Sequence, residues 1–361
     1  MELIYKTFAL VLLLCITLEA TRKPTQISGR FKYRYNTFIV VLFAMVLMFV
    51  SGFRYKFIDT GDYRLMYEAI GPNYDNVFNG TIERVETGYL FFTYLLNCIS
   101  TDSQFLLIVT SVIVNAVYIR KIYKYSEDLP FSLFLYFTLS YMGTMNGIRQ
   151  TLAAALALTV FEWCHKRKTI PYIALILLLM TIHKSVVILI PVYFIVRNKF
   201  FNAGVKGALV FSVLMLVMPG SVTGLLESVL GDSDYASYLS STEGMNIMRF
   251  FVACVPTVLI VLYCRQTNDD YNADPIMRCL MNLCIIDLCA NIMAIRILFF
   301  GRICMYFSIC KLVLIPTLIR RTFPVKTAFK VKLCAVVLYS VYFAYQIYSF
   351  GGYMNNFRLI F

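Results

Sequence analysis

Three polar side chains stand close together in an apolar stretch of the chain, residues 141–163. Asn146, Arg149 and Gln150 are spaced i, i+3 and i+4, so a helix would place their polar ends on one face. A charge between two hydrocarbon-length apolar segments is costly and needs a reason. The spacing therefore predicts a small polar notch at one membrane surface. The alternative is that Arg149 only extends to lipid headgroups from a helix end.

A histidine interrupts another apolar run. His183 lies within residues 172–194, with Lys184 and Ser185 directly after it. A neutral imidazole in this position could act as a general base near pH 7. It could equally be a helix-end histidine that bonds a backbone carbonyl. Both interpretations are open from the sequence.

The composition excludes a soluble globular protein. Of the 361 residues, 60% are hydrophobic and 15% are charged, whereas soluble domains carry about 45–50% apolar and 25% charged residues. Apolar runs of roughly 15–20 residues recur along the chain, near the length of a helix that crosses a bilayer. Because helices satisfy their own backbone hydrogen bonds in lipid, the sequence predicts an all-α polytopic membrane protein with residues 1–361 as a single domain.

The net charge of +13 does not indicate nucleic-acid binding in such a chain. The basic residues gather in short stretches between apolar runs, as the positive-inside rule describes, and two of these stretches, 22–34 and 320–332, contain no acid. The eleven Cys lie mostly inside apolar segments, without a CxxC pair, and the chain has two His. Neither a disulfide framework nor a thiolate metal site is indicated.

Placing the acid-free basic stretches in the cytoplasm predicts about twelve crossings, with external loops at about 54–86 and 220–246. Residues 3–18 are interpreted as a retained helix rather than a cleaved signal peptide, because five cations without an acid follow. The predicted crossings are residues 3–18, 36–53, 104–119, 131–145, 151–164, 172–182, 186–196, 203–218, 247–264, 276–293, 303–318 and 333–350.

The segment 87–118 poses a parity problem in this scheme. It holds two apolar runs, yet its flanking loops allow one crossing. Residues 87–99 are therefore predicted to form a short re-entrant or interfacial helix. A re-entrant segment is tolerated only where it is buried in protein or lines a watery cavity, so this helix also indicates an outward-facing polar cavity.

Under this topology the cations that hydropathy does not explain fall on the outer side. Arginines that face a cavity are a common means of binding phosphate, because one guanidinium can bond two oxygens and stays charged. A diphosphate is the expected ligand. Asp59 and Asp62 supply too few oxygen ligands for calcium, so no metal is predicted. The residues expected at this surface are Arg54, Asp62, Glu86, Arg149, His183, Lys184, Arg249, Arg296 and Arg302.

Six short motifs follow one another between the apolar runs. They are Gly52-Phe53-Arg54, Asp59-Thr60-Gly61-Asp62-Tyr63, Glu86-Thr87-Gly88-Tyr89, Gly147-Ile148-Arg149-Gln150, His183-Lys184-Ser185 and Gly301-Arg302-Ile303-Cys304-Met305-Tyr306-Phe307. In order and spacing they resemble the EpsG/Wzy-type polysaccharide polymerases of bacteria. The resemblance covers residues 36–320, and Ser185-Val186 stands where a small residue is often seen after the lysine.

The resemblance implies a glycosyltransferase of the bacterial inner membrane. Such an enzyme joins undecaprenyl-diphosphate-linked oligosaccharide repeat units at the periplasmic or outer side and lengthens an O-antigen, capsule or exopolysaccharide. No nucleotide sugar, cofactor or metal is expected. The implied partners are the lipid-linked oligosaccharide, the lipid bilayer, and a flippase and a chain-length regulator of the same pathway.

The expected roles divide between charge and proton transfer. Arg149 would stabilise charge on the lipid diphosphate, and His183 or an external carboxylate would take the proton from the acceptor sugar hydroxyl. Glu86 and Asp62 are the candidates for that carboxylate, or for orienting His183 or the arginines. A membrane transporter or flippase for a lipid-linked saccharide is the alternative function. A carrier, however, is expected to have paired repeats, and the sequence shows none. The expected diphosphate- and sugar-binding residues are Arg54, Asp62, Gln150, Lys184, Arg296 and Arg302; residues after 320 have no assigned role.

Overall fold

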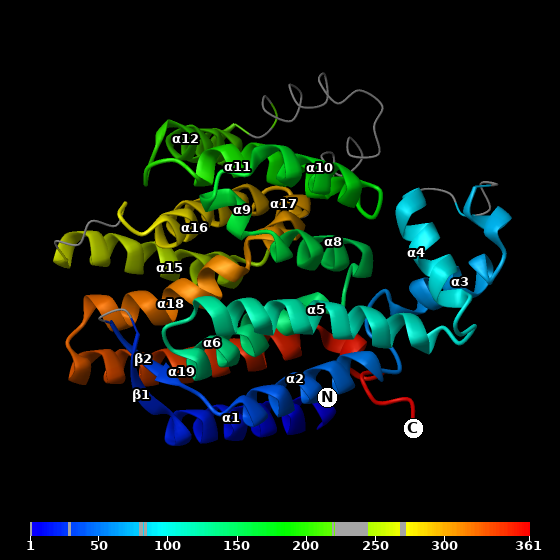
Figure 1. The fold of residues 1–361 in the computed structure, drawn as a ribbon, viewed down its shortest axis with the longest axis horizontal. Helices are drawn as coiled ribbons and strands as arrows, with labels where there is room; N and C mark the ends of the chain where they lie inside the picture. The colour runs from blue at the N-terminus through cyan, green and yellow to red at the C-terminus, as the bar shows by residue number, and fades with distance from the viewer. Residues whose placement is uncertain are drawn as a thin grey trace. The chain divides into compact units, whose positions relative to one another are not determined.

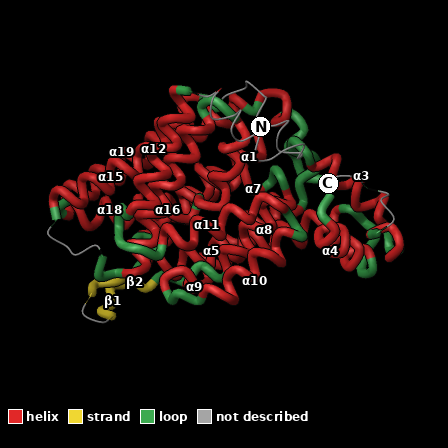
Figure 2. Tube along the Cα trace, turned by 90° about the horizontal axis from the view of Figure 1, so that it is seen from above, coloured by secondary structure: helices red, strands yellow, loops and turns green. Residues whose placement is uncertain are grey.

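The computed structural model describes residues 2–27, 30–78, 82, 85–218, 220, 245–267 and 272–361. Helices make up 79% of the structure, which confirms the predicted all-α class (Figures 1 and 2). Five described helices are long and apolar enough to cross a membrane, and a bent pair could form a sixth span. Four further apolar helices are shorter. The total of about twelve crossings stays a prediction.

The chain forms two compact units. Unit 1 comprises Met1–Val160, Ile173–Val187 and Val325–Phe361, and unit 2 comprises Phe161–Tyr172 and Ile188–Pro324. The predicted single polytopic domain stays a prediction. The helix α10 (Thr169–Met180) contributes residues to both units.

Unit 1 is built around α5 (Gln104–Tyr125), which contacts α2, α3, α4, α6 and α8. The stretch expected as external loop 54–86 contains two of the helical elements, α3 and η1. The elements of unit 1 other than α5 and α10 are α1 (Glu2–Thr21), β1 (Lys23–Ile27), β2 (Arg30–Arg34), α2 (Thr37–Gly52), α3 (Thr60–Ile70), η1 (Tyr74–Val77), α4 (Thr87–Asn97), α6 (Leu129–Tyr136), the π-helical η2 (Phe137–Tyr141), α7 (Met142–Thr144), α8 (Ile148–Thr159), α19 (Val325–Ser349) and η5 (Gly351–Met354).

The two acid-free basic stretches hold regular structure that the sequence does not predict. Residues 22–34 contain an antiparallel hairpin, in which β1 pairs with β2 and Lys23 lies opposite Arg34. In the second stretch, α19 already begins at Val325, eight residues before the predicted span. Lysines at a helix end can extend to the membrane surface, so a cation does not mark where a helix stops. The predicted external loop 220–246 lies largely outside the described residues.

Several predicted crossings differ from one straight, regular α-helix. Residues 131–145 include the π-helical turn η2, and residues 151–164 divide into α8 and α9 (Glu162–His165). In unit 2, Leu298–Phe307 and Ile309–Thr322 meet at a bend of 63°. Hydropathy reports the total apolar length of such a segment, and it does not report a change of direction within it.

Unit 2 is built around α16 (Pro275–Ala294), which contacts α9, α11, α12, α15, α17 and α18. The buried Asn282 of α16 holds the turn after α11, because its side-chain amide donates to Val196 O and accepts from Phe201 N. The short helix η3 (Lys184–Ile188) lies mainly in unit 1, and only its last residue belongs to unit 2. The remaining described elements of unit 2 are α11 (Leu189–Val196), α12 (Ala203–Val217), α15 (Ile247–Gln266), α17 (Leu298–Ile303), η4 (Cys304–Phe307) and α18 (Ile309–Thr322).

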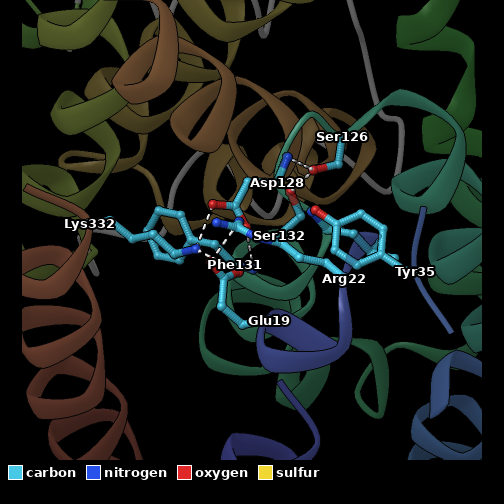
Figure 3. Close-up of polar contacts among 9 residues, drawn as sticks. Glu19, Arg22, Tyr35, Ser126, Asp128, Phe131, Ser132 and Lys332 are labelled. Carbon is cyan, nitrogen blue, oxygen red and sulfur yellow. Dashed lines mark hydrogen bonds and ion pairs between the residues drawn. The ribbon is translucent and has the colours of Figure 1, made fainter. Parts of the chain in front are cut away.

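One end of unit 1 carries a compact polar cluster (Figure 3). Lys332 of α19 binds Asp128 at 2.6 Å and Glu19 of α1 at 3.2 Å, and Arg22 binds Glu19 at 2.6 Å. Tyr35 accepts a hydrogen bond from the backbone N–H of Leu129. The cluster therefore joins the end of α1 to the starts of α2, α6 and α19.

The opposite end of the same helices carries different contacts. Gln104, at the start of α5, donates to the carbonyl of Gly52, at the end of α2. The backbone after α19 pairs with the residues after α2, through a hydrogen bond from Tyr55 N to Arg358 O of 2.6 Å. Because α2, α5 and α19 each run from one end to the other, unit 1 has two distinct polar ends.

A buried ion pair gives a prediction for unit 2. Asp287 of α16 is 1% exposed and its Oδ2 binds Lys311 of α18 at 3.2 Å. Removing one partner of a buried pair leaves an uncompensated charge and costs about 3–5 kcal/mol, whereas an apolar replacement of both is often tolerated. We expect Asp287→Leu and Lys311→Met each to reduce the free energy of unfolding by that amount, measured by titration with a denaturing detergent.

The double variant Asp287→Leu/Lys311→Met is the matched control. It should recover most of the lost free energy, because neither charge is left without its partner. Additive losses in the double variant would contradict a coupled pair.

Candidate functional site

One carboxylate in unit 1 joins two of the predicted catalytic residues. Glu86 Oε2 binds Arg149 Nη1 at 2.5 Å, and Glu86 Oε1 lies 3.0 Å from His183 Nδ1. The backbone N–H of Lys184 also donates to Oε1, at 3.0 Å. Residues separated by as many as 97 positions in the sequence therefore form one charged cluster. This arrangement of Glu86, Arg149 and His183 is the candidate site.

The three side chains are exposed to different degrees. The Glu86 side chain is 9% exposed, whereas those of Arg149 and His183 are 24% and 22% exposed. Burial raises the pKa of Glu86, but the His183 hydrogen bond, the Lys184 N–H and the Arg149 charge more than offset it and lower that pKa to about 2. Glu86 is therefore an ionised anchor at neutral pH, and the partners it holds are the accessible groups.

The ionised state of Glu86 fixes the histidine tautomer. A carboxylate can only accept a hydrogen bond, so His183 Nδ1 carries a hydrogen and donates it to Oε1 at 3.0 Å. In the neutral imidazole this leaves Nε2 as the proton acceptor. The geometry thus favours His183 over Glu86 as a general base, with Glu86 in an orienting role.

A close backbone approach brings the carboxylate to the histidine. Glu86 is the N-cap of α4, and the N–H of Tyr89 in the first turn donates to Thr181 O at 3.1 Å. A Cβ atom on Gly88 would lie 2.7 Å from Thr181 O and still closer to Thr181 Oγ1. Gly88 is required here because only a residue without a side chain allows α4 to lie against the segment that bears His183.

The arginine is positioned by the turn before α8. Gly147 is the N-cap of α8 and has a positive φ of 64°, which favours glycine. Its N–H donates to Asp59 Oδ2 at 2.6 Å, and Arg149 N lies 3.5 Å from Tyr63 OH. The motif around Asp59 and Tyr63 therefore fixes the start of the helix that carries Arg149.

Arg54 has a different environment from Arg149. Its side chain is buried, at 2% exposure, and its nitrogens donate to Ser51 O, to Thr60 Oγ1 at 3.2 Å and to Met145 O at 3.3 Å. In this conformation the guanidinium joins α2, α3 and the turn before α8. The sequence predicts that Arg54 binds diphosphate, whereas its contacts in the structure are those of a positioning residue.

Of the other predicted binding residues, Lys184 joins the Glu86 cluster through its backbone N–H. Asp62 is exposed in the first turn of α3, Gln150 is buried in α8, and the side chain of Lys184 is exposed. Arg296 and Arg302 are exposed residues of unit 2, where Arg296 Nε donates to Leu216 O at 3.2 Å. Their predicted roles remain predictions.

Three residues that position the candidate site are not predicted in these roles from the sequence. They are Gly88, which allows close packing, Thr181, which it packs against, and Asp59, which accepts the hydrogen bond from Gly147 N–H. The motif that carries the resemblance contains Gly88 and Asp59, but a motif does not show what each member touches. Among the residues that the structure describes, no group of three His, Cys, Asp or Glu side chains is placed to hold a metal ion.

The apolar helices and the charged cluster at the end of unit 1 define a multi-pass helical membrane protein with a polar site. The chain belongs to the EpsG family, whose model matches residues 5–360. That match confirms the resemblance drawn from the motifs, and it extends past residue 320 to nearly the whole chain. No curated protein and no solved structure matches the chain. Family membership indicates a broadly polysaccharide polymerase-type function.

Substitution of Gly88 tests the close approach. Gly88→Ala would push α4 away from Thr181 and separate Glu86 from His183, so we expect polymer formation to fall about 10²-fold, the usual cost of a misplacement of about 1 Å. The matched control is Gly143→Ala in α7, where an added Cβ meets nothing within 4 Å. Polymer formation in cells, at equal protein in the membrane, is the measurement. Equal activity of the two variants would contradict the packing role of Gly88.

The lowered pKa of Glu86 predicts a pH dependence of stability. A folded-state pKa of about 2, below the ordinary 4.5, stabilises the fold above pH 4.5, and this contribution is lost as the pH falls from 4.5 towards 2. We expect Glu86→Gln to lower the melting temperature in detergent at about pH 6. The difference from the wild type should shrink on acidification to about pH 3. A difference that is constant over this range would show that Glu86 is not the titrating group.

Proposed function

We propose that this chain is a polysaccharide polymerase that joins undecaprenyl-diphosphate-linked oligosaccharide repeat units on the outer side of the bacterial inner membrane. The observation that carries the proposal is the Glu86 cluster, in which one buried carboxylate holds an arginine and an oriented histidine. The two groups are of the types needed to stabilise a departing diphosphate and to remove a proton from a sugar hydroxyl.

The distribution of cations supports an outward-facing site. Lys332 and Arg22 lie in the polar cluster at one end of unit 1, and Arg22 directly precedes the basic hairpin β1–β2. Cytoplasmic ends of membrane helices are rich in Lys and Arg. The candidate site lies at the other end of the helices that leave this cluster, since Arg54 follows α2 and its side chain contacts the turn before α8. The end of unit 1 that carries Lys332 and Arg22 is then cytoplasmic, and the end that carries the candidate site is external.

The proposed reaction is a nucleophilic displacement at an anomeric carbon. The hydroxyl oxygen of the acceptor sugar forms a bond to C1 of the donor, and the bond from C1 to the phosphate oxygen breaks. The lipid diphosphate leaves with the electron pair, next to Arg149, and the hydroxyl proton moves to His183 Nε2. Glu86 stays ionised and stabilises the imidazolium that forms. The reaction requires no redox partner, and we propose that it requires no metal.

The residues outside the cluster have supporting roles in this proposal. Gln150 and Lys184 are neighbours in sequence of Arg149 and His183, and Asp62 belongs to the same motif as Asp59. We assign these three, with Arg296 and Arg302 of unit 2, to contacts with sugar or diphosphate. A flippase and a chain-length regulator of the same pathway are the proposed protein partners.

The proposed function is tested by incubating purified protein with lipid-linked repeat unit in the presence of EDTA. The expected result is a ladder of longer products. Translocation of the lipid-linked saccharide across vesicles without a ladder would favour the transporter or flippase instead. A ladder that disappears with EDTA and returns with a divalent cation would refute metal independence.

Arg149→Lys tests whether the shape of the guanidinium matters as well as its charge. Arginine can bond two phosphate oxygens at once, whereas an ammonium is a point charge. We expect Arg149→Lys to lose about 10²–10³-fold in polymerisation rate, the usual cost of one oriented donor. If Arg149 only extended to lipid headgroups, the Arg149→Lys protein, at the same level in the membrane as the wild type, would keep nearly the full polymerisation rate. That outcome would remove Arg149 from the proposed mechanism.

A further inference from the structure

The last residues of the chain fold back onto the segment that follows α2. Arg54 and Leu359 form an antiparallel bridge. On either side of it, Tyr55 N donates to Arg358 O at 2.6 Å, and Ile360 N donates to Phe53 O at 3.1 Å. Two hydrogen bonds that flank one bridge fix the register of the pairing. Residues 358–360 thus form a short ladder with residues 53–55, and they belong to the C-terminal segment, residues 350–361.

Aromatic packing anchors this ladder. Phe57 is fully buried, and its ring lies 5.4 Å from that of Phe350 and 5.5 Å from that of Phe357, edge to face in both cases. Met354 and Phe357 are 0% and 2% exposed. Edge-to-face aromatic pairs contribute free energy beyond the burial of their area. The C-terminal segment is therefore packed into unit 1.

The segment held by this ladder leads directly to the candidate site. Arg54, the residue at the bridge, donates from Nη2 to Met145 O at 3.3 Å. Asp59, five residues further, accepts from the N–H of Gly147 at 2.6 Å. Met145 and Gly147 form the turn from which α8 begins, and Arg149 is the second residue of α8.

We propose that the C-terminal segment is a positioning element for Arg149. By pairing with residues 53–55 it holds Arg54 and Asp59 against the turn before α8, and this turn sets the place of Arg149 next to Glu86. The inference rests on the proposed function for its effect on turnover. It gives a role to residues after 320, which the sequence analysis left without one.

The first test compares two substitutions in the C-terminal segment. Phe357→Ala removes a buried ring that contacts Phe57, and Tyr353→Ala removes a ring that is 59% exposed. We expect Phe357→Ala to reduce kcat for polymerisation about 10²-fold with little change in KM for lipid-linked repeat unit. Tyr353→Ala should match the wild type. Equal kinetics for both variants would overturn the proposal.

A second measurement does not depend on the proposed function. Hydrogen–deuterium exchange of residues 142–152 should be faster in Phe357→Ala than in the wild type, because the Gly147 amide loses the support of Asp59. Unchanged exchange would overturn the positioning role. If exchange is faster in Phe357→Ala but the wild-type protein forms no ladder of longer products, the proposed function is refuted. The link between the C-terminal segment and the turn before α8 is then still established.

A reversible cross-link separates positioning from general stability. Phe53 and Ile360 are opposite each other in the ladder, where antiparallel Cα atoms lie about 5.5 Å apart, a distance suited to a disulfide. We expect Phe53→Cys/Ile360→Cys, in the Phe357→Ala background, to regain most activity on oxidation and to lose it on reduction. Each single-Cys variant is the control for the native cysteines. If Phe357→Ala does not fold, Phe357→Leu, which keeps most of the apolar volume, replaces it as background. Failure of the oxidised pair to restore the rate would overturn the proposal.

Discussion

The buried carboxylate of Glu86 is the constraint on which the candidate site depends. An ionised carboxylate with 9% exposure needs compensating charge and hydrogen bonds. Arg149, His183 and the Lys184 N–H supply them, and each comes from a part of the chain distant from Glu86. The fold must therefore bring the starts of α4 and α8 and the turn after α10 to one point. Gly88 makes this possible on one side and the Asp59 contact with Gly147 on the other.

Arg54 and Arg149 lie at this end of unit 1, and they differ in role because they differ in burial. The Arg54 side chain is almost fully buried and donates to two backbone carbonyls, Ser51 O and Met145 O. Burying a guanidinium is acceptable when its donors are satisfied. The Arg149 side chain is about a quarter exposed and shares its charge with one carboxylate. In the proposed function, the first arginine fixes the scaffold and the second meets the substrate.

The sequence predicted the class of fold and the members of the cluster, but not their contacts. Residues 36–53 were predicted as a crossing and form α2 over Thr37–Gly52, because an uninterrupted apolar run fixes a helix. Glu86, Arg149 and His183 are each predicted from the sequence as polar or charged side chains in or beside apolar runs. Their meeting depends on tertiary packing, which hydropathy does not encode. Arg54 was selected by the same criterion, and the structure buries it.

Other features were not predicted because they too depend on tertiary contacts that hydropathy does not encode. The bend between Leu298–Phe307 and α18 is a change of direction that hydropathy does not report. The start of α19 at Val325 is not predicted because lysines near a helix end can extend to the membrane surface while the helix continues. The pair Asp287 and Lys311 is 24 residues apart in the sequence, with nothing local to join its members. The C-terminal segment has no pattern of its own, and its role is visible only where it pairs with Arg54.

The shared carboxylate also couples the two halves of the proposed reaction. Glu86 now divides its charge between Arg149 and His183, at 2.5 and 3.0 Å. A diphosphate bound to Arg149 would draw the guanidinium charge towards phosphate and leave the charge of Glu86 less compensated. Displacement of Glu86 would therefore disturb both the guanidinium that meets the diphosphate and the imidazole that meets the hydroxyl in the proposed reaction. Because both partners act through one anion, their contributions to catalysis cannot be independent.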